Sequence, residues 1–307
     1  MTAAVVTAAI IAGALLLTLV APRALSRWEL LRRDPAAGLL LWQSVSISGV
    51  LTALIAAPVA ALTLDLERRP LLLAAAWTLS LIMLARVLWS GHRVGSDLRR
   101  RRARQRELVD LVGERLESLG STEPHDPVAV LASASPTAYC LPGRRDRIVL
   151  SRAAVDRLGE EELRAVLAHE QTHLDHRHDL LLELFTVLHE AVPSAARAPT
   201  AMREVHLLAE LLADRGAVRR SSAPALGRAL VAMATPAAQT EAGPSPRPDR
   251  AGLLEPALTG TGQNGQVRTR LGLLATDPAP SWVRAGLVGA SSVVLALPPA
   301  LVVTLGW

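Results

Sequence analysis

The sequence contains no lysine, and among its 307 residues it has only one cysteine, one tyrosine and one phenylalanine. A single cysteine, Cys140, excludes a disulfide within the chain and agrees with a reducing compartment for the region around it. Half of the residues are apolar and the mean hydropathy is +0.29, which is too apolar for an ordinary soluble domain of this length. The composition therefore predicts a membrane protein.

The apolar residues gather in four long runs, at about 2–21, 39–64, 70–90 and 283–305. Each run has about the 20 residues that a helix needs to cross a hydrocarbon core of roughly 30 Å, and runs of this length are uncommon in soluble folds. Five of the six tryptophans lie near the ends of these runs, where an indole suits the membrane interface: Trp28, Trp42, Trp89, Trp282 and Trp307. The sequence thus predicts four transmembrane helices.

Arginines follow the first and third runs, in the stretches 23–33 and 93–106. The positive-inside rule places both stretches in the cytoplasm, so a multi-pass protein of the plasma membrane is expected. In this topology the first run is a retained span with the N-terminus outside, the loop at 65–69 and the C-terminus are also outside, and residues 91–282 are cytoplasmic. A dense arginine run can also bind nucleic acid, but this one adjoins a span, so we expect contact with the lipid bilayer and no direct nucleic acid binding.

The region between the third and fourth spans has the pattern of a small α+β domain. Short apolar stretches at 128–132, 138–141 and 147–150 are typical of strands, with a Pro-Gly turn after the second. Apolar residues at helical spacing predict helices over 106–119, 160–190 and 200–220.

These patterns divide the chain into four parts. Residues 1–92 hold three spans, 93–235 form the cytoplasmic domain, 236–281 form a flexible linker and juxtamembrane segment, and 282–307 hold the fourth span. The linker assignment rests on a stretch at 236–265 that is rich in proline, glycine, serine and threonine. The expected fold class is mainly α and membrane-embedded, with an α+β domain between the third and fourth spans.

The motif His169-Glu170-Gln171-Thr172-His173 lies within the helix predicted over 160–190. Positions i and i+4 share one face of a helix, so His169 and His173 can approach the same Zn²⁺ ion. Glu170 then flanks the metal, where it can accept a proton from a zinc-activated water and later protonate the leaving amine. The motif predicts a metallopeptidase with one zinc ion per chain and Glu170 as the catalytic base.

A catalytic zinc site needs a third protein ligand, and the next predicted helix supplies Glu210 in Glu210-Leu211-Leu212-Ala213-Asp214. Asp214, one turn further on, can hydrogen-bond a ligand histidine from behind. The leucines around both acids favour a buried helix over a solvated acidic face.

The other histidines near the motif, His176, His178 and His206, are interpreted as ordinary surface or core residues, with a hydrogen bond to the transition state as the alternative. Residues Ala138, Tyr139 and Cys140 form either a plain structural strand or the edge strand against which an extended substrate pairs.

Together these sequence motifs resemble those of the BlaR/MecR-type membrane zinc metallopeptidases. The resemblance rests on 168–173, on 210–214 and on Tyr139-Cys140-Leu141-Pro142-Gly143, and it is strongest from about 128 to 220. It implies a gluzincin-like fold, Glu210 as the third zinc ligand, and cleavage of a cytoplasmic protein such as a winged-helix repressor. The beta-lactam receptors of that family also carry an extracellular penicillin-binding domain with an acylated S-x-x-K serine, and this sequence lacks such a domain and has no lysine.

Two alternatives remain beside signal-driven cleavage of a repressor. The first is a housekeeping peptidase of membrane-protein quality control, similar to the heat-shock or prenyl-protein membrane peptidases. The second is a non-catalytic membrane signalling subunit with a vestigial metal site. The intact motif favours an enzyme over the second alternative.

Overall fold

A computed structural model of the chain describes residues 3–63, 69–112, 114–115, 128–143, 145–235 and 262–303. The described residues are mostly helical and divide into two compact units. Unit 1 comprises residues 1–95, 183–208 and 278–307, and unit 2 comprises 96–182 and 209–277. Residues 183–208 thus group with the apolar helices, although the sequence pattern assigns them to the cytoplasmic domain.

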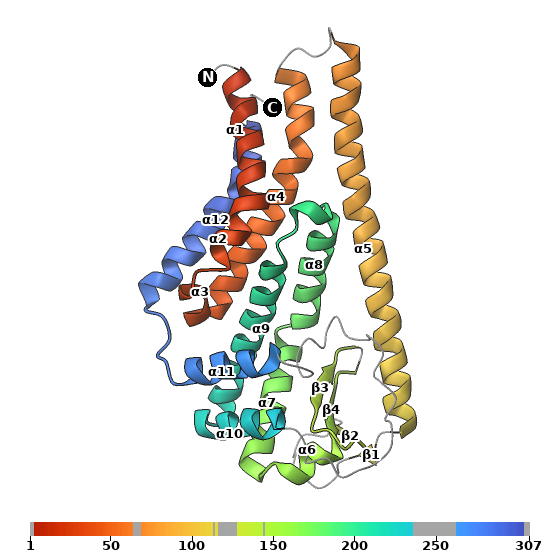
Figure 1. Ribbon diagram of the computed structural model, residues 1–307, viewed down its shortest axis with the longest axis vertical. Coiled ribbons are helices and arrows are strands. Elements are labelled where there is room, and N and C mark those ends of the chain that lie inside the picture. Colours follow the sequence, from red (N-terminus) through yellow and green to blue (C-terminus); the bar gives the residue numbers. More distant parts are fainter. Residues whose placement is uncertain are drawn as a thin grey trace. The chain divides into compact units, whose positions relative to one another are not determined.

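Unit 1 is built from long apolar helices (Figure 1). They are α1 (Ala3–Leu15), the π-helical turn η1 (Leu16–Val20), α2 (Ala21–Leu25), α4 (Pro35–Thr63), the first part of α5 (Pro70–Val112) and α12 (Ser281–Val303), with the short α3 (Leu30–Arg33) before α4. α1 and α12 both pack against α4. Among the residues that the structure describes, four helical segments are long and apolar enough to cross a membrane: Thr7–Leu25, Pro35–Leu62, Pro70–Val112 and Ser281–Ala300.

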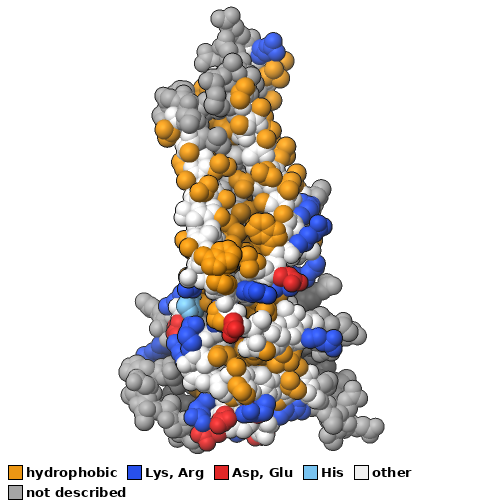
Figure 2. Space-filling view, turned by 90° about the vertical axis from the view of Figure 1, so that its left-hand side faces the viewer, with side chains coloured by type: hydrophobic (Ala, Val, Ile, Leu, Met, Phe, Trp, Pro, Cys, Tyr) orange, Lys and Arg blue, Asp and Glu red, His pale blue; other side chains and the backbone are white. Residues whose placement is uncertain are grey.

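The outer surface of these helices is apolar, as expected for helices that cross a membrane. Large apolar side chains stand exposed along them, among them Leu71, Leu81, Leu88 and Val293. Figure 2 shows hydrophobic side chains gathered over this part of the molecule on the face in view. Such a broad apolar surface is unfavourable in water, and contact with lipid removes the penalty. The four expected spans therefore correspond to four helices of suitable length and composition.

Polar contacts between distant segments fix the packing inside unit 1. The Ser48 hydroxyl donates to the carbonyl of Val294 at 2.8 Å, which ties α4 to α12. Arg32, in α3, donates two hydrogen bonds to the buried carboxylate of Glu204, at 2.8 and 2.9 Å. A segment next to the first span is thereby joined to a helix that follows the metal-binding motif.

Unit 2 contains a four-stranded sheet in the order β1-β2-β4-β3. The strands are β1 (Glu114–Arg115), β2 (Val128–Leu131), β3 (Ala138–Leu141) and β4 (Arg147–Ser151). β2 and β4 are parallel, while β3 pairs with β4 and β1 with β2 in the antiparallel sense. Three of the strands lie where the sequence predicts them, and β3 is at one edge of the described sheet.

The helices of unit 2 cover this sheet and one another. They are α6 (Arg152–Arg157), α7 (Glu160–Asp175), α10 (Ala223–Ala234), α11 (Gly262–Leu274), and parts of α8 (His178–Ala191) and α9 (Pro199–Arg220); the short η3 (Ser194–Ala196) in unit 1 lies between α8 and α9. α7 contacts β3, β4 and α10, and α11 packs on α10.

Two predicted helices differ from the observed ones. The helix expected over 106–119 is the end of α5 and stops at Val112, and the next described residues form β1. The helix expected over 160–190 is interrupted at Arg177, whose φ of 49° is left-handed, so that α7 and α8 are separate helices. Most of the expected linker, residues 236–261, and most of the loop at 65–69 lie outside the described residues.

Candidate metal centre

Helix α7 presents the two motif histidines, and its sequence explains why it forms there. Three glutamates occupy its first turn, where negative charge favours the helix dipole, and the Glu162 carboxylate accepts from the backbone N–H of Gly159 at 3.1 Å. Leu163 and Val166 bury one face in a core cluster with Leu150 of β4. This packing fixes the rotation of α7.

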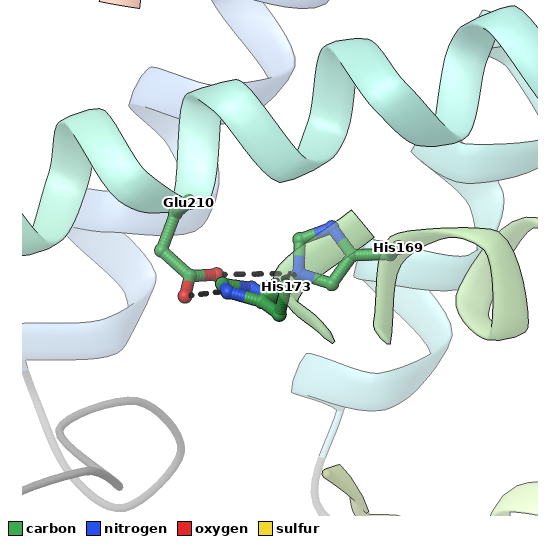
Figure 3. Close-up of side chains that lie close together, drawn as sticks. All are labelled: His169, His173 and Glu210. Atoms are coloured by element: carbon green, nitrogen blue, oxygen red, sulfur yellow. Dashed lines mark hydrogen bonds and ion pairs between the residues drawn. The ribbon is translucent and has the colours of Figure 1, made fainter. Parts of the chain in front are cut away.

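The imidazoles of His169 and His173 meet one turn apart, as the i, i+4 spacing predicts. Their Nε2 atoms are 3.2 Å apart, and the carboxylate of Glu210 reaches both rings from α9 (Figure 3). Each Nε2 lies 3.5 Å from one of the two carboxylate oxygens. The three predicted metal ligands are therefore together, with their ligand atoms within 4.8 Å of one another.

These distances fit a zinc ion. Bonds of about 2.0–2.1 Å in a tetrahedral arrangement separate any two ligand atoms by roughly 3.4 Å. The observed separations of 3.2 and 3.5 Å agree with this value. Two imidazole nitrogens and one carboxylate oxygen are also a donor set found in catalytic zinc sites.

Behind these ligands, Asp214 and Arg270 form a buried ionic cluster. Asp214 Oδ1 lies 3.0 Å from Nδ1 of His169, on the side of the ring away from Glu210. The guanidinium of Arg270, on α11, makes a two-pronged ion pair with Asp214, at 2.6 and 2.8 Å. A third contact, of 2.8 Å, joins Arg270 to Glu210. One cation thus contacts the carboxylates of both Glu210 and Asp214.

The charges explain the protonation states of this cluster. Burial raises the pKa of Glu210 and Asp214, but the Arg270 cation and the contacts with the histidines together outweigh burial and hold the pKa of both groups below their ordinary values. Burial lowers the pKa of His169, but its contacts with Asp214 and Glu210 raise that pKa to about 10. Both acids are therefore ionised, and a metal that binds at His169 has to displace a proton.

Glu170 points into a different environment. The residue is 9% exposed, and burial is the main cause that raises the pKa of its carboxyl to about 7. The Cys140 thiol of β3 hydrogen-bonds it, and burial raises the pKa of that thiol far above its ordinary value, so Cys140 is a neutral neighbour. A carboxyl with a pKa near neutrality can both accept and return a proton.

Strand β3, for which the sequence left a structural and a substrate-binding role open, runs beside α7. Tyr139 pairs with Val149 of β4. The alternation of an antiparallel ladder then directs the backbone groups of Ala138 and Cys140 away from β4. These groups are placed where an extended peptide could add to the sheet.

The remaining histidines have different positions. His178 is buried and its Nδ1 lies 2.7 Å from Nδ1 of His173, whereas His176 stacks on His178. His206 belongs to unit 1 and is not part of the described cluster. Arg270 was not singled out by the sequence pattern, because it lies 56 residues after Asp214 in a segment interpreted as juxtamembrane.

The helix pair, its two histidines and the incoming glutamate define a metallopeptidase of the H-E-x-x-H class. Residues 102–278 match Peptidase family M48, and the chain belongs to this family. The matched range contains the whole cluster, including Arg270 on α11. Searches among curated proteins and among solved structures found no significant match to the chain.

Proposed function

We propose that the protein is a membrane-embedded zinc metalloendopeptidase in which His169, His173 and Glu210 hold one zinc ion and Glu170 is the general base. The observation that carries this proposal is the spacing of 3.2 to 3.5 Å among the two imidazole Nε2 atoms and the Glu210 carboxylate, which come from two different helices. A solvated acidic face would not bring a glutamate to two imidazoles that are largely buried.

Each residue of the site has a separate role in the proposed reaction. Zinc bound there would supply a Lewis acid that activates a water molecule and polarises the scissile carbonyl. Glu170 accepts the proton of the attacking water and delivers it to the leaving amine, a role that suits a buried carboxyl next to a ligand histidine in the sequence. Asp214 orients His169 through Nδ1, and Arg270 keeps Asp214 and Glu210 ionised.

The substrate would bind as an extended strand along β3. The backbone groups of Ala138 and Cys140 that face away from β4 can pair with a peptide, and Cys140 lies against Glu170. A peptide in this position would bring its carbonyl groups past the catalytic carboxyl. Backbone pairing of this kind favours unfolded or flexible segments of a protein substrate.

The test compares Glu170→Gln with His169→Ala in the purified full chain. Glu170→Gln should keep about one zinc per chain and lose hydrolysis of an unstructured protein such as casein, while His169→Ala should lose both. Removal of zinc by a chelator should abolish wild-type hydrolysis, and added Zn²⁺ should restore it. Hydrolysis at the wild-type rate by the Glu170→Gln variant, or by the metal-free protein, would refute the proposed mechanism.

For the biological substrate we propose a cytoplasmic protein, with a winged-helix repressor as the first candidate. The arginine-rich stretches support a cytoplasmic site, and the resemblance to BlaR/MecR-type peptidases supports a repressor. The sidedness is tested with single cysteines introduced into a Cys140→Ala background at the exposed positions 97 and 231, by measuring their labelling with a membrane-impermeant reagent. Labelling from outside intact cells would refute it.

Quality control of membrane proteins is the second candidate. Membership of a peptidase family favours it, because that membership carries no implication of a dedicated signal. Proteomics of a strain that produces only Glu170→Gln separates the two candidates. One stabilised repressor supports regulation, and many stabilised membrane proteins support quality control.

A further inference from the structure

His178 is buried beside the proposed metal ligands, although the two polar nitrogens of its ring make burial unfavourable unless they have hydrogen-bond partners. It is the first residue of α8 and is 2% exposed. Its Nδ1 lies 2.7 Å from Nδ1 of His173, and its Nε2 has no hydrogen-bond partner among the described residues. The contact with His173 is thus the polar interaction that accounts for a histidine at this place.

When a metal is bound, two neutral imidazoles can form this contact with only one pair of tautomers. Nε2 of His173 faces His169 and Glu210, so it is the atom that must keep its lone pair free for a metal. The proton of a neutral His173 then resides on Nδ1. That N–H donates to Nδ1 of His178, which must accept and carry its own proton on Nε2.

The backbone between the helices supports a specific placement of this ring. α7 ends at Asp175, and only two residues, His176 and Arg177, separate it from α8. Arg177 has a φ of 49°, a conformation that is unfavourable for a residue with a side chain. Residues held in such conformations often occur at functional sites. Here the break between the two helices places the ring of His178 against His173 in the last turn of α7.

The two histidine ligands therefore have different partners. His169 contacts the carboxylate of Asp214 at its Nδ1, whereas His173 contacts the imidazole of His178. The partner behind a metal-bound histidine sets its tautomer and orientation, and loss of that partner commonly weakens metal binding about 10- to 100-fold.

We propose that His178 is a positioning residue whose Nδ1 accepts the Nδ1–H of His173 and so fixes the ring with Nε2 toward the metal. This inference rests on the proposed zinc site. It adds a residue that acts on the site through His173 without reaching the metal or the substrate itself.

The test uses His178→Ala, which removes the acceptor, and His178→Asn, whose Oδ1 can replace Nδ1 as acceptor. His176→Ala is the matched control, because within the described residues its ring stacks on His178 and not on a ligand histidine. Zinc dissociation constants are measured by competition with a chromophoric chelator, and the Co²⁺-loaded proteins are compared by visible absorption. Circular dichroism of the metal-free variants checks folding, and His178→Phe replaces His178→Ala if the latter does not fold.

We expect zinc affinity to fall about 10- to 100-fold in His178→Ala, to recover to within a few fold of the wild type in His178→Asn, and to stay unchanged in His176→Ala. The Co²⁺ spectrum should change in His178→Ala alone. Wild-type affinity in His178→Ala, or equal losses in the Ala and Asn variants, would overturn the inference. A wild-type protein that binds zinc tightly but hydrolyses nothing would refute the proposed function and leave this inference to be judged by the affinities.

Discussion

Gly216 of α9 lies directly against Thr172 of α7. A Cβ atom at position 216 would be 2.2 Å from the Thr172 hydroxyl oxygen, which itself donates to the carbonyl of Ala168 at 2.7 Å. Thr172 stands between the two motif histidines, and Gly216 follows Asp214 by two residues. This close approach of two helices brings the glutamate of one to the imidazoles of the other.

We therefore expect Gly216→Ala to separate α7 from α9. The added methyl group cannot fit without a shift of backbone or of a 2%-exposed threonine, so a loss of roughly 1–3 kcal/mol in the free energy of unfolding is expected, together with weaker zinc binding. Thermal unfolding and zinc titration measure the two effects. The control is Gly272→Ala on α11, where a Cβ would meet nothing within 4 Å. Equal behaviour of the two variants would contradict the role of this contact.

Arg270→Met should expose the dependence of the site on its buried cation. Without the guanidinium, the carboxylates of Glu210 and Asp214 repel each other in a buried place, and loss of one partner of such a cluster typically costs about 3–5 kcal/mol. The metal-free protein should lose more stability than the zinc-loaded protein, because zinc replaces part of the missing positive charge. Thermal unfolding with and without zinc measures both losses.

Arg270→Lys and Arg268→Met are the comparisons for that experiment. Lysine keeps the charge but cannot form the two-pronged pair with Asp214, so an intermediate loss is expected. Arg268 is exposed on the same helix, and its substitution should have little effect. A stable Arg270→Met protein with normal zinc affinity would show that α11 is dispensable to the site.

The sequence was sufficient for those parts of the site that depend on local periodicity. His169, Glu170 and His173 follow from positions on one helix, and Glu210 follows from a second short motif within a leucine-rich helix. Both inferences use residues close enough in sequence for helical geometry to relate them. The three strands at 128–151 were predicted for the same reason, since apolar alternation and a Pro-Gly turn are local signals.

The parts that the sequence did not reveal depend on contacts between distant segments. Arg270 reaches Asp214 only because α11 packs on α10, and the residues between α10 and α11 carry no pattern that predicts this return. The role proposed for His178 was not predicted, because the helix break at Arg177 contains neither glycine nor proline, so a continuous helix was expected. Gly216 did carry a signal, because an isolated glycine inside a helix often marks close packing.

The Arg32–Glu204 pair provides a stability test in unit 1. Glu204→Met leaves a partly exposed arginine, so a modest loss of roughly 1–3 kcal/mol is expected after allowance for solvent screening. Arg32→Met leaves the buried carboxylate alone and should cost more. The double variant should recover part of the loss, because no unpaired charge remains. Additive losses in thermal unfolding would indicate that the two side chains do not interact.

The raised pKa of Glu170 predicts how stability depends on pH in the metal-free protein. Burial disfavours the charged carboxylate and raises its pKa from an ordinary value of 4.5 to about 7. The group therefore contributes its full stability below pH 4.5, and this contribution is lost as the pH rises through about 7. Glu170→Gln removes the titration, so the variant should match the wild type near pH 4.5 and exceed it by on the order of 3 kcal/mol above pH 7. Thermal unfolding from pH 4.5 to 8.5 measures this difference in stability, and Glu160→Gln, at an exposed glutamate of the same helix, should show none.

Bound zinc should reduce the difference in stability between Glu170→Gln and the wild type, because a nearby cation favours the ionised carboxylate. A stability difference that does not change with pH would mean that Glu170 is not held in a desolvated position beside the metal ligands.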